Sequence, residues 1–483
     1  MKKNQTAAAA AAILGLAFCG DSTAADEPTS RGGDLFSAVD NTAIANPAVT
    51  STDEQSTASA SGAALEGAAA ITGNANTVGV ANTVFNACIG GLNNGTAFGD
   101  DCAVLVIGGT EDPANASAAL ASLTPDQVLA TRTVALAQVD AGLGVAAMRM
   151  GSQRLASGLS GFAPNGTMAA GLLFGQASGG GASGDLQFGR GGAFFNLKYL
   201  NTEQDRDTYT SGYDLDGLHL TLGGDYRVRE NLILGLYGSY TTESVDYRQN
   251  KGDMEMDGWG IGAYGTYYWE GGAFVEGTLG YNRNEYDLRR RIAYGIASDT
   301  DGKTIVRQTA TSSPEADVLY ASLGGGYTID RQSFTITPSA SLNYTENAVD
   351  AYRETMSNPQ AAGGSLAIGY DSQTYTSLTS RLGVMVAKAI SSGSGVFLPQ
   401  LSLDWVHEFQ NDQETLDARF VNDLSNTPLL VTTSRPDHNY FDLGLGISGQ
   451  FAQGRSAFIS VNTLLGYEDV TSYSITGGFR IEF

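Results

Sequence analysis

The chain has 483 residues, and its 51 Asp and Glu residues against 27 Lys and Arg give a net charge of -24 at pH 7. This charge argues against nucleic acid as a partner, because phosphates would be repelled. No stretch approaches the ~18 consecutive apolar residues of a membrane-spanning helix. Membrane-spanning strands are not excluded, because alternation hides their hydrophobicity.

The first 25 residues are predicted to be a secretory signal. Lys2 and Lys3 form its basic region, Ala7 to Leu16 its apolar region, and residues 22–25 are small enough for cleavage. Cys19 leaves a lipoprotein signal as the alternative, although the preceding bulky Phe18 fits that signal poorly.

Residues 26–120 are predicted to form a short segment ahead of the main domain. Residues 26–73 are rich in Ala, Ser, Thr, Asp and Asn, so we expect most of this tract to be disordered. Asn74 to Thr110 predicts a few strands or turns. Cys88 and Cys102 reach an oxidising compartment on export and are predicted to form a disulfide. Metal binding is not predicted, because the chain has three histidines and none lies near this pair.

A helix is predicted next, within residues 121–160. Thr124, Pro125 and Gln127 form a capping-box start, and small residues occupy most faces from Val128 to about Leu155. A slim helix of this kind suits a narrow polar tube, whereas an ordinary amphipathic helix is the alternative. A Gly-rich connector follows at 161–188.

From residue 189 to the end, side chains alternate between apolar and polar. In the last strand one parity holds Tyr473, Ile475, Phe479, Ile481 and Phe483. A soluble β-sandwich is the alternative for such a strand, but short turns here alternate with long polar loops. That alternation predicts a barrel of about twelve antiparallel strands with both ends on the periplasmic side.

Charged residues on the opposite parity are predicted to point into the barrel lumen, because charge on the lipid face costs about 2–4 kcal/mol at the membrane midplane. They are Asp225, Arg227, Glu276, Arg381, Asp404, Glu408, Arg480 and Glu482. We hypothesise that some of them pair with Arg132, Arg149 or Arg154 on the helix and seal the pore. The alternative is that they solvate a wet lumen or pair with one another.

The stretch from Leu123 to Phe483 resembles the translocator half of an autotransporter, the type V secretion β-domain. The resemblance rests on L-T-P-D-Q at 123–127, G-L-H-L-T-L-G-G-D-Y-R-V at 217–228, N-L-I-L-G-L-Y-G-S-Y at 231–240, G-W-G-I-G-A-Y-G-T-Y-Y at 258–268, L-P-Q-L-S-L-D-W-V-H-E-F at 398–409 and the terminal S-I-T-G-G-F-R-I-E-F. It implies a helix threading a twelve-stranded barrel and linking it to a passenger carried across the outer membrane. Residues 26–120 would be that passenger, which is short for this family and has no solenoid repeat.

The same resemblance implies the location and the partners. The aromatic last strand would be read by the barrel-assembly machinery. The barrel would lie in the outer membrane in contact with the lipid bilayer and lipopolysaccharide. Periplasmic chaperones would escort it, and the N-terminal segment would be at the cell surface. We expect a monomer. A plugged porin-like or structural barrel whose loops bind a ligand or surface is the alternative.

No catalytic or cofactor site is predicted. Two G-x-G-x-x-G matches, at 260–265 and 444–449, fall inside alternating strands rather than between a strand and a helix. Gly20-Asp21-Ser22 lies in or beside the signal, no G-x-S-x-G elbow is present, and His407 beside Glu408 does not make a triad. An esterase or protease passenger is therefore the lowest-ranked interpretation.

Overall fold

The computed structural model describes residues 52–89, 91–160, 190–298, 302–331 and 334–483. The chain divides into two compact units, Met1–Thr57 and Ala58–Phe483, and all of the described strands belong to the second. The predicted signal, Cys19, the Gly20-Asp21-Ser22 motif and the connector at 161–188 lie outside the described residues. None of the helices within the described ranges is long and apolar enough to cross a membrane.

Four helices precede the lumenal one in the part that the structure describes. They are α2 (Thr52–Ala70), α3 (Ala75–Ile89), α4 (Ala97–Glu111) and α5 (Pro113–Leu123). The expectation of strands or turns over Asn74 to Thr110 is therefore wrong, and the tract predicted to be mostly disordered is helical from Thr52. We call residues 58–123, which hold most of α2 and all of α3–α5, the cap.

The cap is helical because its N-cap residues and its many alanines, which favour helices, outweigh the strand preference of its valines. Asn74 Oδ1 accepts a hydrogen bond from the Thr77 amide at 3.2 Å, and Thr96 Oγ accepts one from Gly99 at 3.0 Å. Pro113 takes the first position of α5. Asn and Thr caps with a following alanine-rich segment favour a helix over a strand.

The predicted helix start at Thr124 is also wrong. Thr124 is the C-cap residue of α5, and a 3₁₀ turn, η1 (Asp126–Val128), separates it from helix α6 (Thr131–Ser160). The side chain of Gln127 does not complete a capping box. Its amide donates to the Lys251 carbonyl at 2.8 Å, so tertiary packing replaces the local cap.

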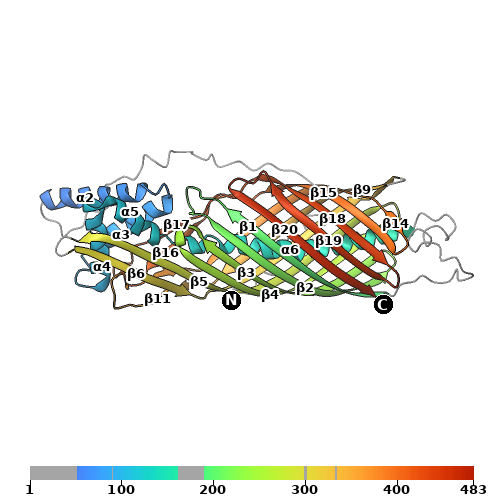
Figure 1. Ribbon diagram of the computed structural model, residues 1–483, viewed down its shortest axis with the longest axis horizontal. Coiled ribbons are helices and arrows are strands. Elements are labelled where there is room, and N and C mark those ends of the chain that lie inside the picture. The colour runs from blue at the N-terminus through green and yellow to red at the C-terminus, as the bar shows by residue number, and fades with distance from the viewer. Residues whose placement is uncertain (1–51, 90, 161–189, 299–301, 332–333) are drawn as a thin grey trace, which may run out of the picture. The chain divides into compact units, whose positions relative to one another are not determined.

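Twelve antiparallel strands close into a barrel, which confirms the predicted fold. In chain order they are β1 (Gly191–Gln204), β2 (Tyr213–Arg229), β3 (Leu232–Tyr247), β4 (Gly252–Tyr268), β5 (Ala273–Ser298), β7 (Glu315–Tyr327), β9 (Phe334–Val349), β13 (Gln373–Ala387), β15 (Gly395–Glu408), β18 (Asn439–Phe451), β19 (Arg455–Leu465) and β20 (Val470–Glu482). Each pairs with the next, and β1 closes the ring by pairing with β20 (Figure 1).

One end of the barrel continues outward. Strand β5 pairs with β7 as far as Glu285 and then, from Leu288, with β6 (Gly302–Ser312), to which β11 (Thr355–Met356) adds. A second sheet comprises β10 (Tyr352–Arg353), β12 (Ile368–Tyr370), β16 (Thr415–Phe420) and β17 (Leu429–Thr432). At this end η2 (Arg248–Asn250) is a 3₁₀ turn, whereas the short strands β8 (Ile329–Arg331) and β14 (Ile390–Ser392) lie at the opposite, short-turn end. We call the outward part the extension; it comprises β6, β10, β11, β12, β16 and β17, the outward ends of β2 to β5 and the loops that join these strands.

The polarity of the two strand faces reverses along the barrel wall. In β2, the inward side chains begin with the buried Tyr213 and Leu215 and continue with His219, Thr221 and Asp225. The outward ones begin with Asp214 and Asp216 and continue with the exposed Leu218, Leu222 and Tyr226. The change falls at Gly217, and β4 shows it at Gly258. The wall is therefore apolar outside at membrane level and apolar inside in the extension.

Aromatic residues border the outward apolar band. Exposed aromatic side chains towards the extension include Tyr199, Tyr240, Trp259, Trp405 and Tyr473, and those towards the short turns include Tyr226, Trp269, Tyr327, Phe334 and Phe483. Two such girdles mark the interfaces of an outer-membrane barrel, and its short turns face the periplasm. The long loops and the extension lie beyond the other girdle, at the end of the barrel opposite the short turns.

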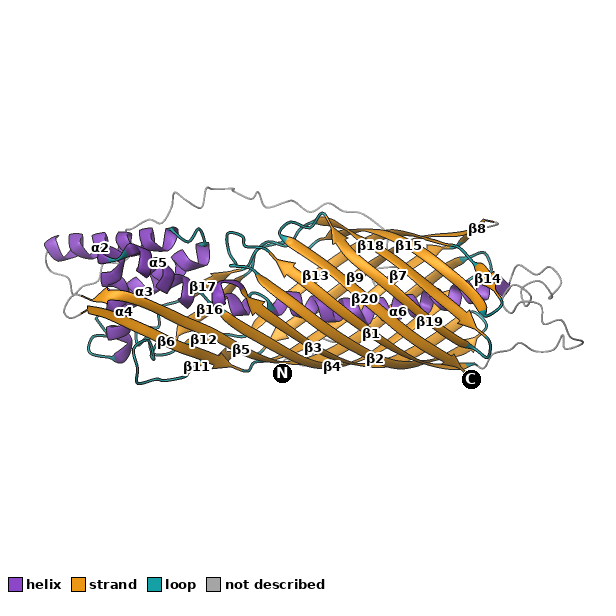
Figure 2. Ribbon diagram, in the orientation of Figure 1, coloured by secondary structure: helices purple, strands orange, loops and turns teal. Residues whose placement is uncertain are grey.

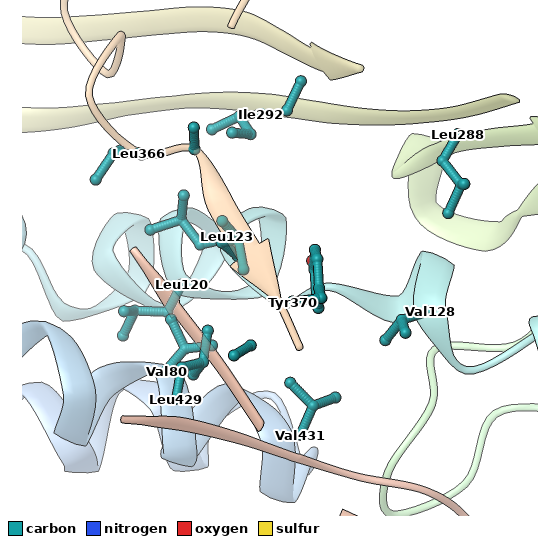
Figure 3. Close-up of a cluster of buried hydrophobic side chains, with 14 of the residues drawn as sticks. Val80, Leu120, Leu123, Val128, Leu288, Ile292, Leu366, Tyr370, Leu429 and Val431 are labelled. Carbon is teal, nitrogen blue, oxygen red and sulfur yellow. The ribbon is translucent and has the colours of Figure 1, made fainter. Parts of the chain in front are cut away.

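The inward apolar face of the extension packs against the cap. Buried side chains of the cap, such as Val80, Leu120 and Leu123, share one cluster with Leu288 and Ile292 of β5 and with residues of the second sheet (Figure 3). The core of this end of the molecule is therefore built from segments that are far apart in the sequence.

Candidate functional site: the lumen, its helix and the cap

Helix α6 runs inside the barrel along its length (Figure 2). It lies against β1 to β5, β7 and β9. At Gly142 the helix backbone comes close to the wall, because a Cβ there would lie 2.8 Å from the hydroxyl of Tyr320. That hydroxyl is 2.8 Å from the hydroxyl of Tyr237 on another strand. The small residues of α6 therefore fit the narrow space inside the wall.

A carboxylate on the helix, Asp140, joins two sides of the barrel. Its Oδ2 lies 2.7 Å from Lys198 Nζ on β1, and its Oδ1 lies 3.2 Å from Arg381 Nη2 on β13. Arg381 also pairs with Asp442 on β18 at 3.0 Å. Here the helix supplies the carboxylate and the wall supplies the cations. The predicted pairing of helix arginines with wall charges stays a prediction.

Of the three helix arginines named by that hypothesis, the structure describes the side chain of Arg132. Arg132 donates to the carbonyl of Gln410, in the loop after β15, at 3.4 Å. The side chains of Arg149 and Arg154 lie outside the described residues. Whether α6 seals the pore stays a prediction.

Several other wall charges have partners within the wall. Asp225 pairs with Arg480 at 3.0 Å and accepts a hydrogen bond from Tyr264, and Arg480 also contacts Glu482. Glu408 accepts from Ser377 Oγ at 2.5 Å and from the Leu378 amide at 3.0 Å. Glu276 and Asp404 line cavities in the lumen, and Arg227 is half-buried on the inward parity of β2.

Sequence reasoning missed Lys198, Asp140 and the buried His219–Glu243 pair, whose Nε2 and Oε1 atoms are 3.3 Å apart. Two signals were present. Asp140 is the lone acidic residue in the sequence of α6, and Lys198, His219 and Glu243 all lie on the inward parity of their strands.

The helix does not fill the lumen evenly. A cavity of about 450 Å³ lies between α6 and the wall on the side of β13, β18 and β20, and a second of about 270 Å³ continues towards the short turns. Leu129, Leu136 and Leu143, spaced seven residues apart, face the first cavity. Both cavities are lined by Ser, Thr and Asn of the wall, so the helix leaves room for water on one side.

An ion pair buried in the extension holds the end of the cap. Arg290 of β5 contacts Glu354 at 2.6 Å and donates to the carbonyls of Leu123, at the end of α5, and Leu366. Burial alone would lower the pKa of Arg290, but the carboxylate of Glu354 more than offsets this and the net shift is upward. The guanidinium therefore stays charged and joins three segments of the chain.

A second contact joins the turn between α3 and α4 to the loop between β16 and β17. Asn93, fully buried, donates to Asp423 at 2.7 Å and accepts from the Leu424 amide at 2.9 Å. Burial alone would raise the pKa of Asp423, but hydrogen bonds from Ser425, Asn93 and Thr427 lower it below its usual value. Cys88 and Cys102 are bonded and link α3 to α4, with their Cα atoms 6.0 Å apart.

Three other loops make comparable contacts. Asn76 donates to the carbonyls of Tyr209 and Thr432. Asp101 accepts from Gly363 and Ser365. In the link between cap and α6, Asp126 pairs with Lys251 at 2.9 Å, both nearly fully buried. These polar contacts add geometric specificity to the shared apolar core.

The alternating wall, its girdles and its lumenal helix agree with the comparisons with known proteins. The family model described as the autotransporter β-domain matches residues 193–462. The chain belongs to the autotransporter family. This autotransporter barrel is 26% identical over 292 residues to Esterase EstA of Pseudomonas aeruginosa, and the match covers 58% of this chain and 40% of that protein. It is 26% identical over 282 residues to outer membrane protein A of Rickettsia conorii, covering 57% and 13%.

Among solved structures, the translocator domain of the autotransporter NalP from Neisseria meningitidis is similar at 14% identity and a TM-score of 0.45, covering 61% of this chain and 88% of that one. The autotransporter chain spans less than half the length of these two curated relatives, EstA and outer membrane protein A. In its described residues, no group of three or more His, Cys, Asp or Glu side chains is placed to hold a metal ion. The two G-x-G-x-x-G matches lie within β4 and β18 of the wall.

Proposed function

We propose that this outer-membrane autotransporter carries its own N-terminal segment across the membrane and keeps it at the cell surface as the cap. One observation carries the proposal. Helix α6 runs through the lumen and connects the cap, at the long-loop end, with the short-turn end where β1 begins (Figure 2). A chain threaded in this way has its cap on the outer side of the membrane and its barrel termini on the inner side.

The transport needs no bond chemistry from the barrel. The outward side chains of the last strand, Tyr473, Ile475, Phe479, Ile481 and Phe483, are exposed to lipid, and we propose that the barrel-assembly machinery reads them. Periplasmic chaperones would hold the chain before insertion. The inserted barrel would then contact bilayer and lipopolysaccharide as a monomer, and the segment would cross while α6 takes its place in the lumen.

Retention rather than release follows from the docking contacts. The Arg290, Asn93, Asn76 and Asp101 contacts are made to several different loops of the barrel, and a common apolar core lies between them. Release would expose that core and leave the buried Arg290–Glu354 pair to water. We therefore propose that the cap is a permanent part of the surface-exposed structure, without a catalytic role of its own.

Labelling of intact cells tests the topology. Glu66→Cys puts a thiol on an exposed position of the cap, and Gly271→Cys puts one in the open turn between β4 and β5 at the opposite end. Because Cys88 and Cys102 are bonded, a membrane-impermeant maleimide should label Glu66→Cys on intact cells. Gly271→Cys should be labelled after the outer membrane is permeabilised. A Glu66→Cys protein protected until permeabilisation would refute surface display.

A further inference from the structure

The cap is too small and too poor in large apolar side chains to build its own core. In the shared cluster it supplies seven buried residues larger than alanine, excluding cysteine, which are Leu65, Val80, Val84, Phe98, Leu105, Leu120 and Leu123. The extension supplies more, among them Tyr247, Met254, Met256, Tyr286, Leu288, Ile292, Tyr294, Ile296, Leu366, Phe420, Leu429 and Val431. A helical segment of this length with so little apolar surface to bury is marginal as an independent domain.

The cap and the extension pack closely against each other through apolar surfaces. A Cβ on Gly108 of α4 would lie 2.4 Å from Cγ2 of Ile296 on β5, so the helix backbone rests directly on the strand. On the neighbouring position, a Cβ on Gly109 would lie 2.8 Å from the Leu65 backbone of α2. Phe98 of α4 packs on Phe420 of β16 with ring centroids 5.3 Å apart. Helix α4 thus packs between helix α2 of the cap and strand β5 of the extension.

The extension needs the cap in turn. Its inward face, including Ile292 and Ile296, is apolar at a level where the outward face is charged. Without the cap this face would be exposed to water, since the polarity reversal removes it from lipid. The two surfaces are complementary halves of one core.

We infer that the extension of the barrel has a function of its own, which is to act as the folding template of the cap. This inference rests on the proposed surface display. The template surface is created when the barrel closes, and it lies on the outer side of the membrane. The buried side chains of the cap find the rest of their core on this surface, so the cap completes its fold when it meets the extension.

The test uses the full chain on intact cells. Glu66→Cys is labelled with an impermeant fluorescent maleimide, and loss of the label is followed during proteinase K digestion. Phe420→Ala alters the barrel sequence alone. It should leave labelling intact and speed label loss by roughly tenfold or more, because the open population of the cap rises with the loss of core packing. Val421→Ala, at an exposed neighbouring position, should digest like the parent.

Ile292→Ala is a second core variant, on β5. It shows whether faster digestion in Phe420→Ala comes from lost core packing or from an assembly defect specific to that variant. Barrel closure in each variant is checked by the shift in electrophoretic mobility on heating. All variants carry Glu66→Cys, and the chain with this change alone is the reference. An unlabelled reference chain would refute display itself. A labelled cap that resists digestion equally in the reference, Phe420→Ala and Ile292→Ala would overturn the template while leaving display in place. Phe98→Ala should also speed digestion. If the effect of Phe98→Ala/Phe420→Ala on the rate of label loss is smaller than the combined effects of the two single variants, the result supports a shared core.

Discussion

The ammonium of Lys198 on β1 lies 2.7 Å from the carboxylate of Asp140 on the lumenal helix. Arg381, on the far side of the lumen, approaches the other oxygen of the same carboxylate. One acidic side chain thus ties the helix to two strands that are not neighbours in the barrel. These two ion pairs join the helix to opposite sides of the wall.

Asp140→Ala should loosen the helix in the lumen. The substitution leaves the nearly buried Lys198 without its carboxylate partner, at a cost of about 1–3 kcal/mol. In planar bilayers the variant should show more frequent large-conductance openings than the parent, with deletion of residues 131–157 setting the upper limit. Glu66→Ala removes an acidic residue outside the lumen and should behave like the parent. Identical traces for Asp140→Ala and the parent would contradict a holding role for Asp140.

Arg290→Met should destabilise the docked cap strongly. It leaves Glu354 buried and unpaired, which typically costs about 3–5 kcal/mol. Unfolding of the purified chain by urea, followed by its helical circular dichroism, should shift to lower concentration. Arg290→Met/Glu354→Met should recover part of the loss. Arg419→Met breaks an exposed pair with Asp371 and should cost less than about 1 kcal/mol. Equal shifts for the two single variants would count against a structural role for the buried pair.

Docking of the cap should weaken in acid through Asp423. The pKa of this carboxyl is lower in the folded protein than its ordinary value near 3.8, so the folded state binds fewer protons. The stabilisation is therefore present above pH 3.8 and is lost as the pH falls through the folded pKa. Asp423→Asn should lower the thermal midpoint at pH 7 and flatten its decline between about pH 5 and 3. A decline as steep as the parent's would assign the acid sensitivity to other groups.

The three tryptophans should report the membrane boundaries. Trp259 and Trp405 belong to the girdle nearest the extension, and Trp269 to the girdle near the short turns. In vesicles of brominated lipid, bromine near the headgroup should quench their fluorescence more than bromine near the chain ends, because tryptophan prefers the interface. Each Trp→Phe variant should lose part of the quenched signal. Stronger quenching of any tryptophan by bromine near the chain ends would show that its girdle does not lie at the membrane interface.

The barrel was predictable from the sequence because each membrane strand repeats one rule, with apolar residues such as Leu218 and Leu222 outward and polar ones inward. The number of strands followed from the alternation of short turns with long loops. The cap was not predictable in the same way. Its valine-rich runs near Cys88 and Cys102 suit strands as well as helices. The buried positions that decide between the two are defined by contacts with distant parts of the chain, such as that of Leu123 with Arg290 and that of Asn93 with Asp423.

The lumen was predicted in part. Parity placed Arg381 and Asp225 inward, but it gave no information on which partner each would meet. Asp140, the lone acid of α6, was missed because the pairing hypothesis considered the arginines of the helix alone as partners of the wall charges. The reversal of polarity at Gly217 and Gly258 was readable in the sequence, since Tyr213, Leu215, Met254 and Met256 break the pattern of polar inward residues. A pattern search that assumes an apolar outward face along the whole strand does not detect such a change.

The reversal of strand polarity also bears on how this protein can be recombined. A fusion in which the cap is replaced by a foreign segment would remove the residues that cover Ile292 and Ile296. The strands of the extension would then expose their apolar faces above the cell surface, and such a hybrid would aggregate. Grafting a foreign cargo here calls for trimming the strands back to Gly217 and Gly258, the points at which the wall ceases to serve the membrane.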